Sequence, residues 1–202
     1  MKSMKMRLMA GAMMAAGAIA ASPVWAESGL DTVAAYSVAA RHNFTVVIPA
    51  FLSFRVGTAG VTIDTITFSP TVAQLGTGPI AGAGGTGGGG GSTTDVVLLS
   101  NAGQVTITAT NNSGGLGLST GTVADGYINF NEITATSGNA ALTPPALTNA
   151  GGTTTTPTLN AGTKVTNQSA TWTYAYANSA VPSAGTYGGA SSGQATYTAT
   201  AP

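Results

Sequence analysis

The stretch TWTYAYA near the C-terminal end of the printed sequence constrains the fold more than any other feature. Trp172, Tyr174 and Tyr176 occupy every second position, with small residues between them. A period of two places all three aromatic side chains on one face of an extended strand and the small residues on the other. The stretch therefore predicts a half-buried β-strand, and the chain must supply a core against which its aromatic face packs.

A second alternating run at 194–200 surrounds Tyr197. Pro182 and Gly185, which lie between the two runs, are typical turn residues. Two aromatic strands separated by turn residues predict a hairpin that closes a β-sheet.

The composition favours an all-β domain. Only 12 of the 202 residues are Lys, Arg, Asp or Glu, whereas glycine alone accounts for 29. Good helix formers are scarce, threonine favours strands, and no window beyond residue 26 keeps a 3.6-residue apolar period. Eight to ten short strands with Gly- and Pro-rich turns predict an antiparallel β-sandwich with long Gly/Thr-rich loops rather than an α/β fold.

The first 26 residues have the pattern of a secretory signal peptide. Three basic residues within the first seven positions precede an apolar run over 8–21, and small residues occupy Val24 and Ala26, the positions that signal peptidase reads. We expect cleavage after Ala26, leaving 27–202 as a single β-sandwich domain exported to the periplasm, the cell surface or the medium. An uncleaved anchor is the alternative, although the apolar run is short for a membrane span.

The predicted mature chain excludes several classes of partner. It holds three basic residues against six acidic ones, a formal charge of −3. Without a basic patch, nucleic acid and anionic lipid are poor partners. No cysteine is present, so burial and backbone pairing must stabilise the domain without disulfides. No membrane span is expected after cleavage.

Alternating patterns predict further strands, and glycine, proline and threonine mark the connections between them. The predicted strands fall at 43–48, 52–56, 61–68, 95–99, 104–110 and 127–133. The apolar phase shifts within 61–68, which predicts a β-bulge near Asp64. Two long surface connections are expected, a mobile glycine-rich loop at 76–92 and a Thr- and Pro-rich stretch at 143–162.

Candidate catalytic and ligand-binding motifs are weak. The stretch GAGGTG at 82–87 matches the dinucleotide fingerprint, but more glycine follows it where a helix is required. His42 is the single histidine, and a catalytic triad would have to use it with Asp31 or Asp64, yet no G-x-S-x-G elbow presents a serine. We therefore expect no catalytic residue and no cofactor, and keep an exported hydrolase that uses His42 as an alternative.

One cluster of oxygen ligands leaves calcium binding open. Asp125, Asn129, Asn131 and Glu132 carry oxygens that calcium accepts. Their spacing does not match an EF-hand loop, and alternation would place Asn129 and Asn131 on a solvent face.

The aromatic residues have two interpretations. Buried strand aromatics usually belong to the core, and we take Trp172, Tyr187 and Tyr197 as candidate core anchors. Exposed, the same ladder of rings would offer a stacking platform for a sugar. A carbohydrate- or surface-binding module is therefore the first alternative function.

The end of the chain resembles a known class of surface proteins. The stretch PSAGTY at 182–187, followed by the alternating ATYTAT at 195–200, is similar to the closing motif of secreted bacterial immunoglobulin-like proteins, namely spore-coat-U-type and other chaperone–usher pilins. The match covers about the last twenty residues. The chain differs from many such pilins in lacking cysteines and in having extra residues at 188–193.

The resemblance implies that the sandwich is an immunoglobulin-like antiparallel β-sandwich, which assembles by accepting a strand from a neighbouring subunit. The expected function is an exported, non-enzymatic structural or surface protein such as a fimbrial subunit, whose partners are copies of itself or other surface subunits. The segment 30–40 lies near the mature N-terminus, where a donor strand must be free. Its alternating residues Ala34, Tyr36, Val38 and Ala40 are the candidate assembly segment, and pairing within its own chain is the alternative.

Overall fold

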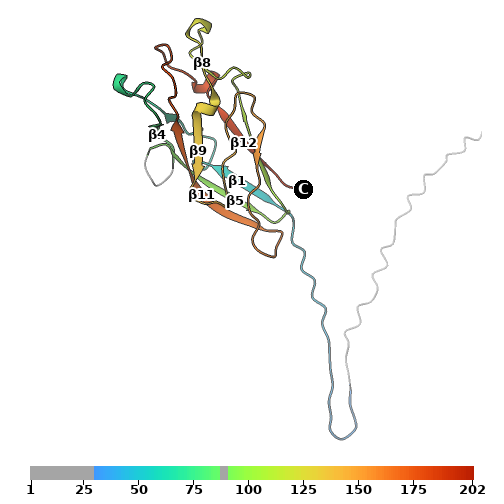
Figure 1. Ribbon diagram of the computed structural model, residues 1–202. Coiled ribbons are helices and arrows are strands. Elements are labelled where there is room, and N and C mark those ends of the chain that lie inside the picture. Colours follow the sequence, from blue (N-terminus) through green and yellow to red (C-terminus); the bar gives the residue numbers. More distant parts are fainter. Residues whose placement is uncertain (1–29, 87–90) are drawn as a thin grey trace, which may run out of the picture. The chain divides into compact units, whose positions relative to one another are not determined.

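The computed structural model describes residues 30–86 and 91–202 (Figure 1). The predicted signal peptide at 1–26 lies outside the described residues. The chain divides into two units, residues 1–48 and 49–202. In the first unit, residues 30–48 contain no helix or strand, and almost all of them are exposed.

The second unit holds all the described secondary structure, which confirms the all-β prediction. Its helical elements are single 3-10 turns: η1 (Val72–Gln74), η2 (Val123–Asp125), η3 (Phe130–Glu132) and η4 (Gly189–Ser191). Its strands are β1 (Leu52–Val56), β2 (Ile66–Thr67), β3 (Ile80–Ala81), β4 (Ala83–Gly84), β5 (Thr93–Ser100), β6 (Thr106–Asn111), β7 (Leu118–Ser119), β8 (Tyr127–Ile128), β9 (Ile133–Ser137), β10 (Thr153–Thr155), β11 (Thr166–Tyr176) and β12 (Ala195–Thr200).

The largest sheet is antiparallel and is built around β11. The first part of β11 pairs with β5, which pairs in turn with β1, and the last part pairs with β9 and β3. Figure 1 shows β1, β5 and β11 side by side. On β11, Trp172, Tyr174 and Tyr176 are buried while Thr173 is exposed, as the period of two requires.

The second sheet has the order β10–β6–β12, and both of its pairings are antiparallel. Two small ribbons, β2–β4 and β7–β8, accompany the larger sheets. Both larger sheets bury side chains in one hydrophobic core. Its members are Val96, Leu98, Val105, Ile107, Ala109, Phe130, Leu142, Leu147, Trp172 and Tyr174.

The predicted hairpin between the two aromatic strands is wrong. β11 and β12 belong to different sheets and do not pair with each other. Their aromatic faces meet through side chains instead. The rings of Trp172 and Tyr197 stand edge to face with centroids 5.2 Å apart, and the hydroxyls of Tyr174 and Tyr197 lie 3.2 Å apart. Aromatic packing, rather than a backbone ladder, joins the two strands.

The stretch at 143–162 is not simply a surface connection. Pro145 and Leu147 are buried within it, and β10 pairs with β6. Just before it, the backbone oxygen of buried Leu142 accepts a 2.9 Å hydrogen bond from Nε1 of Trp172. The stretch therefore contributes to the core because its few apolar residues point inward, and its threonines pair through their backbone.

The described part of the glycine-rich stretch is also more ordered than predicted. It forms β3 and β4, and Ile80 is buried. Gly84 has a φ of +93°, and a Cβ there would stand 2.3 Å from the Thr65 backbone oxygen. Only glycine fits such a close approach of two backbones. Buried Asn178 holds the preceding turn, donating to the backbone oxygens of Gln74 and Gly78.

Three predicted strands are shortened or missing. Residues 43–48 are extended but unpaired, and within 61–68 only β2 pairs. No bulge is needed at Asp64, because its carboxylate accepts hydrogen bonds from the backbone N–H and the hydroxyl of Thr58 and closes a turn. The alternation at 127–133 is interrupted by η3, which buries Phe130.

Among residues 30–86 and 91–202, no helix has the length and apolar character needed to cross a bilayer.

Candidate functional site

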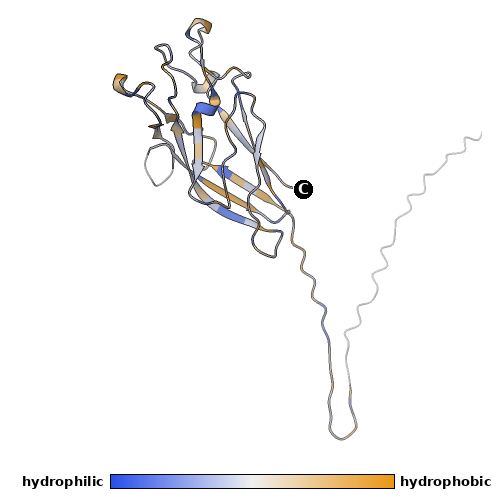
Figure 2. Ribbon diagram, in the orientation of Figure 1, coloured by the Kyte–Doolittle hydropathy of each residue, from blue (hydrophilic) through white to orange (hydrophobic). Residues whose placement is uncertain are grey.

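A large groove lies in the second unit, beside the edges of its two larger sheets. Its volume is about 1200 Å³. β1 contributes Phe54 and Val56, the β2 region contributes Ile66 and Phe68, and β12 contributes Tyr197. In Figure 2, β1 alternates between hydrophobic and hydrophilic residues, as expected for a strand with one face toward apolar surroundings. The groove is suited to apolar side chains because its walls are mainly aliphatic and aromatic.

One boundary of the groove is the unpaired edge of β12. Among the described strands, β12 pairs only with β6, and none pairs with its second edge. Gln194 bonds to Asn112 at the end of the β6 pairing. Because backbone direction alternates along a strand, Thr196 and Thr198 also point toward β6. The backbone N–H and C=O groups of Ala195, Tyr197 and Ala199 therefore point to the open edge.

The other boundary is the unpaired edge of β1. The backbone oxygen of Phe51 accepts from Asn101, and the N–H of Gly57 donates to Asp95, so odd-numbered residues of β1 face β5. The even-numbered residues 52, 54 and 56 therefore direct their backbone groups away from β5. Phe54 and Val56 also turn their side chains toward the core. Each strand thus combines apolar side chains with unpaired backbone groups next to the groove.

Tyrosines supply part of the polar surface of the groove wall. Burial raises the pKa of Tyr174, and the neighbouring hydroxyl of Tyr197 raises it further. Burial also raises the pKa of Tyr197, although the hydrogen bond from Tyr174 opposes the shift. The pKa of Tyr176 is raised by burial first and then by the negative charge of Glu132. All three phenols are neutral near pH 7 and serve as packing surface with hydrogen-bonding tips.

The three candidate core anchors occupy different places. Trp172 is fully buried at 0% exposure, and Tyr197 is half-buried against the core. Tyr187 lies outside the core cluster, in the groove wall, and its hydroxyl donates to the backbone oxygens of Asp125 and Ser183. The expectation of a core position for Tyr187 is therefore corrected, because its hydroxyl holds loop backbone instead of leaving the ring free to enter the apolar interior.

The aromatic ladder of β11 presents little surface for sugar stacking. Tyr174 is 6% exposed and Tyr176 is 7% exposed, while Trp172 has no exposed surface. A sugar stacks on an open ring face, and these faces are covered by the core and by the groove wall.

The candidate assembly segment is exposed but irregular. Ala34, Tyr36, Val38 and Ala40 are all exposed, and none lies in a strand. The carboxylate of Asp31 accepts hydrogen bonds from the backbone N–H groups of Val33 and Ser37, which lowers the pKa of that carboxyl. The chain bends there, and Ala35 has a φ of +77°. The predicted alternation therefore does not correspond to a straight strand over 34–40.

The residues proposed for a catalytic triad are engaged separately. The ring of His42 is tilted toward Phe44, with centroids 6.3 Å apart. The carboxylate of Asp31 bonds to its own loop, and that of Asp64 bonds to Thr58. Neither acid is found orienting the imidazole, so the described residues provide no acid–histidine pair for nucleophile activation.

The candidate calcium ligands point to different partners. Asp125 accepts from the hydroxyl of Thr120, and Glu132 accepts from Ser179 through its backbone N–H and its hydroxyl. The side-chain oxygen of Asn129 accepts from Asn149. Within the part of the chain that the structure describes, no group of three or more His, Cys, Asp or Glu side chains could hold a metal ion.

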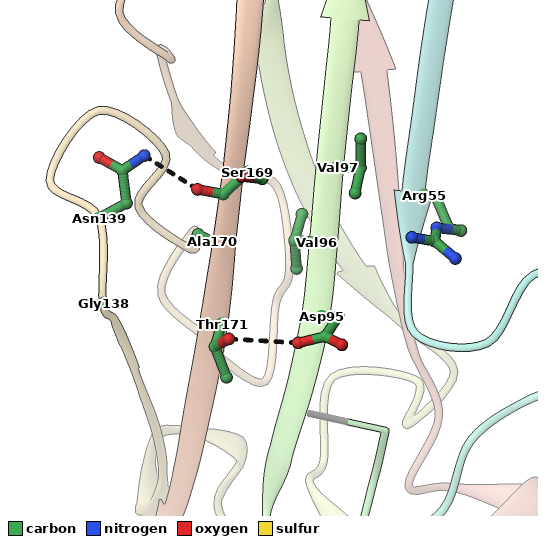
Figure 3. Close-up of a pocket in the computed structure, with 9 residues that line it drawn as sticks. All are labelled: Arg55, Asp95, Val96, Val97, Gly138, Asn139, Ser169, Ala170 and Thr171. Atoms are coloured by element: carbon green, nitrogen blue, oxygen red, sulfur yellow. Dashed lines mark hydrogen bonds between the residues drawn. The ribbon is translucent and has the colours of Figure 1, made fainter. Parts of the chain in front are cut away.

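A second hollow of about 430 Å³ lies beside β1, β5 and β11 and is shown in Figure 3. Three of its polar side chains bond to one another or to the backbone. The hydroxyl of Thr171 donates to Asp95 at 3.2 Å, and the amide nitrogen of Asn139 donates to the backbone oxygen of Ser169 at 2.9 Å. The groove between the sheet edges is therefore the stronger candidate site, because its backbone groups lack partners.

Sequence reasoning identified Tyr197 but missed most of the groove. Phe54, Phe68 and Leu118 are the kind of large apolar residues that a strand pattern assigns to a core. The alternation in the sequence indicates which face of each strand these residues occupy. It does not indicate that this face lacks a covering strand.

Comparisons of the chain with protein-family models, with curated proteins and with solved structures gave no match.

Proposed function

We propose that the mature chain is an exported, non-enzymatic structural subunit of a surface assembly. Its fold is an immunoglobulin-like β-sandwich that lacks one strand, and it accepts that strand from a neighbouring copy. The observation that carries the proposal is the apolar groove flanked by the unpaired edges of β1 and β12.

The open edges support strand acceptance on physical grounds. An unpaired edge next to apolar surface is a template for pairing with another chain, and proteins normally protect it with charges, proline or a covering segment. Neither β12 nor the groove-facing positions of β1 carry such protection. Strand addition uses both elements, since backbone pairing gives affinity and pockets for alternate side chains give specificity.

The sandwich assignment is supported by two features. Sheets that share one core, as here, are the basis of sandwich folds. The hydroxyl of Tyr187 bonds back to the oxygen of Ser183, four residues upstream, in the manner of the tyrosine corner found in immunoglobulin-like domains. Both features agree with the C-terminal resemblance to secreted pilins.

Export and assembly are tested on protein recovered from the host that makes it. We expect an intact mass for a chain beginning at Glu27, and elongated multimers in negative-stain micrographs. A mass that includes residues 1–26 would contradict export by cleavage. A chain that stays monomeric at high concentration and forms no filament would overturn the assembly proposal.

A proline variant tests whether the edge of β12 takes part. The N–H of Ala195 points away from β6, so Ala195→Pro removes an edge donor without removing a bond of the sheet. We expect this variant to keep the wild-type circular dichroism spectrum and to lose its multimers. Thr198→Val is the matched control, because its side chain is exposed and does not line the groove, and its N–H faces β6. Unchanged multimers in Ala195→Pro would exclude the β12 edge.

A further inference from the structure

Residues 43–48 carry a strand pattern but lie in no strand of the structure. Phe44, Val46 and Ile48 alternate and are 90%, 82% and 74% exposed. Within the described part of the first unit, the ring of Phe44 lies 6.3 Å from that of His42, centroid to centroid. Three large apolar side chains on one face, fully presented to water, are unusual for a soluble chain and mark an interaction surface.

This segment is better suited to fill a groove than the segment at 34–40. The earlier segment is bent at Ala35, and two of its four alternating residues are alanines. Alanine buries little apolar surface, whereas phenylalanine, valine and isoleucine bury much more. Valine and isoleucine also favour the extended conformation that strand addition requires.

We propose that residues 43–48 of one copy are the strand that fills the groove of a second copy. The backbone of this strand pairs with the open edge of β12, and the side chains of Phe44, Val46 and Ile48 enter the groove between β1 and Tyr197. The inference rests on the proposed function and names the occupant of the same site.

The lengths of donor and acceptor agree. Six residues in an extended strand span about 20 Å, and both 43–48 and β12 contain six. Pro49, directly after the donor, has no N–H and ends the ladder.

The short connection to β1 determines the kind of assembly. Only residues 49–51 separate Ile48 from Leu52, a reach of about 14 Å at full extension. A donor seated in one copy therefore holds its own body directly beside that copy. Donor and acceptor are different surfaces, so the contact is head-to-tail and generates an open linear array unless the rotation closes a ring.

The first test compares two matched double variants of the full mature chain. Phe44→Asp with Val46→Asp places two carboxylates in the proposed donor, and Tyr36→Asp with Val38→Asp places two in the earlier segment. We expect the first variant to lower the multimeric fraction at least tenfold and the second to leave it unchanged. Both should retain the circular dichroism spectrum and unfolding midpoint of the body at 49–202.

The second test locates the donor by cross-linking, which is straightforward because the chain has no cysteine of its own. Chains carrying Phe44→Cys or Ile48→Cys are mixed with chains carrying Ala195→Cys and mildly oxidised. We expect one of the two donors to give covalent heterodimers at least ten times more abundantly than Tyr36→Cys does. Which one reacts reports whether the donor runs parallel or antiparallel to β12.

The outcomes separate this inference from the proposed function. Multimers that survive Phe44→Asp with Val46→Asp but are lost in Tyr36→Asp with Val38→Asp would assign the donor to 34–40 and overturn the inference, while the proposed function would stand. Cross-links that form only within a single chain carrying both cysteines would make the occupant the chain's own segment and overturn it too. Wild-type chains that never associate would overturn the proposed function itself.

Discussion

Replacing Trp172 tests the interior from which both sheets are built. Its side chain has no exposed surface, its Nε1 donates to the Leu142 oxygen at 2.9 Å, and its ring meets Tyr197 edge to face at 5.2 Å. Burial of a tryptophan removes roughly 200 Å² from water, which at about 25 cal/mol per Å² corresponds to about 5 kcal/mol. Measured truncations of large buried aromatics cost about 3–5 kcal/mol, so we expect that range for Trp172→Ala.

The loss is large relative to the whole domain, because typical domains unfold with a free energy of about 5–15 kcal/mol. Trp172→Phe should cost less, about 1–3 kcal/mol, since it keeps an aromatic ring but leaves the buried Leu142 oxygen without its donor. Thr173→Val is the matched control, because Thr173 lies next to Trp172 on the exposed face of β11 and its change should stay within about 0.5 kcal/mol.

The assay is urea unfolding of the mature chain followed by circular dichroism, at concentrations where it is monomeric. Trp172 is the only tryptophan in 27–202, so the fluorescence of the wild type reports on this side chain alone. Native emission close to that of free tryptophan in water, or a cost below about 1 kcal/mol for Trp172→Ala, would refute the placement of this side chain in the core.

Three further predictions concern titration, backbone conformation and a buried amide. Burial raises the pKa of Tyr174 and Tyr197 above the usual value of about 10. Their contribution to stability is therefore complete below pH ~10 and is lost as the pH rises through the folded-state pKa. The urea midpoint of unfolding should fall in that alkaline window, and Tyr197→Phe should reduce the fall. Gly84→Ala should cost about 1–3 kcal/mol in urea unfolding beyond the cost of Gly60→Ala, because both positions have positive φ but only Gly84 has a backbone oxygen 2.3 Å from the added Cβ. Asn178→Ala should lower the unfolding free energy by about 1–3 kcal/mol, since the Gly78 oxygen and the Gly76 N–H lose their partner while the Gln74 oxygen keeps its bonds from Thr77; an unchanged midpoint would show that water replaces the amide.

The position of most long strands was predictable because strand alternation is a local property. β1, β5, β6 and β12 lie within two residues of the predicted bounds, whereas β11 begins five residues before the aromatic stretch at 171–177; its buried face is the aromatic one. A period of two is visible within a few consecutive residues, and their side chains determine which face of the strand is apolar.

Pairing partners were not predictable in the same way. Turn residues between β11 and β12 favoured a hairpin, yet the connection at 177–194 carries the chain to the other sheet. The same side-chain pattern satisfies either arrangement, since Tyr197 packs against Trp172 whether the two strands share a sheet or face each other across the core. Choosing between them requires knowledge of every competing partner, including β5, β6 and β9.

Two short strands, β10 and β4, lie in stretches that were predicted as connections, for a different reason. β10 consists of Thr153–Thr155, and β4 is an Ala–Gly pair. Composition indicates whether the burial of side chains can offset the entropy that a segment loses when it becomes ordered. These two strands are held instead by backbone hydrogen bonds to β6 and β2. Such pairing depends on a neighbour with an open edge, which composition does not reveal.

The candidate site could be predicted only in part, because the sequence indicates which face of a strand is buried but not which backbone edge is unpaired. Alternation specified that Phe54 and Tyr197 face inward, but it carries no information on which backbone edge of β1 or β12 is bonded. That depends on register, which the pairings to β5 and β6 supply. Conversely, residues 43–48 have as clear a strand pattern as β1 and yet pair with nothing in the described chain. A strand pattern outside any sheet and a groove flanked by unpaired edges are complementary, and this complementarity is the reason for proposing strand addition between copies.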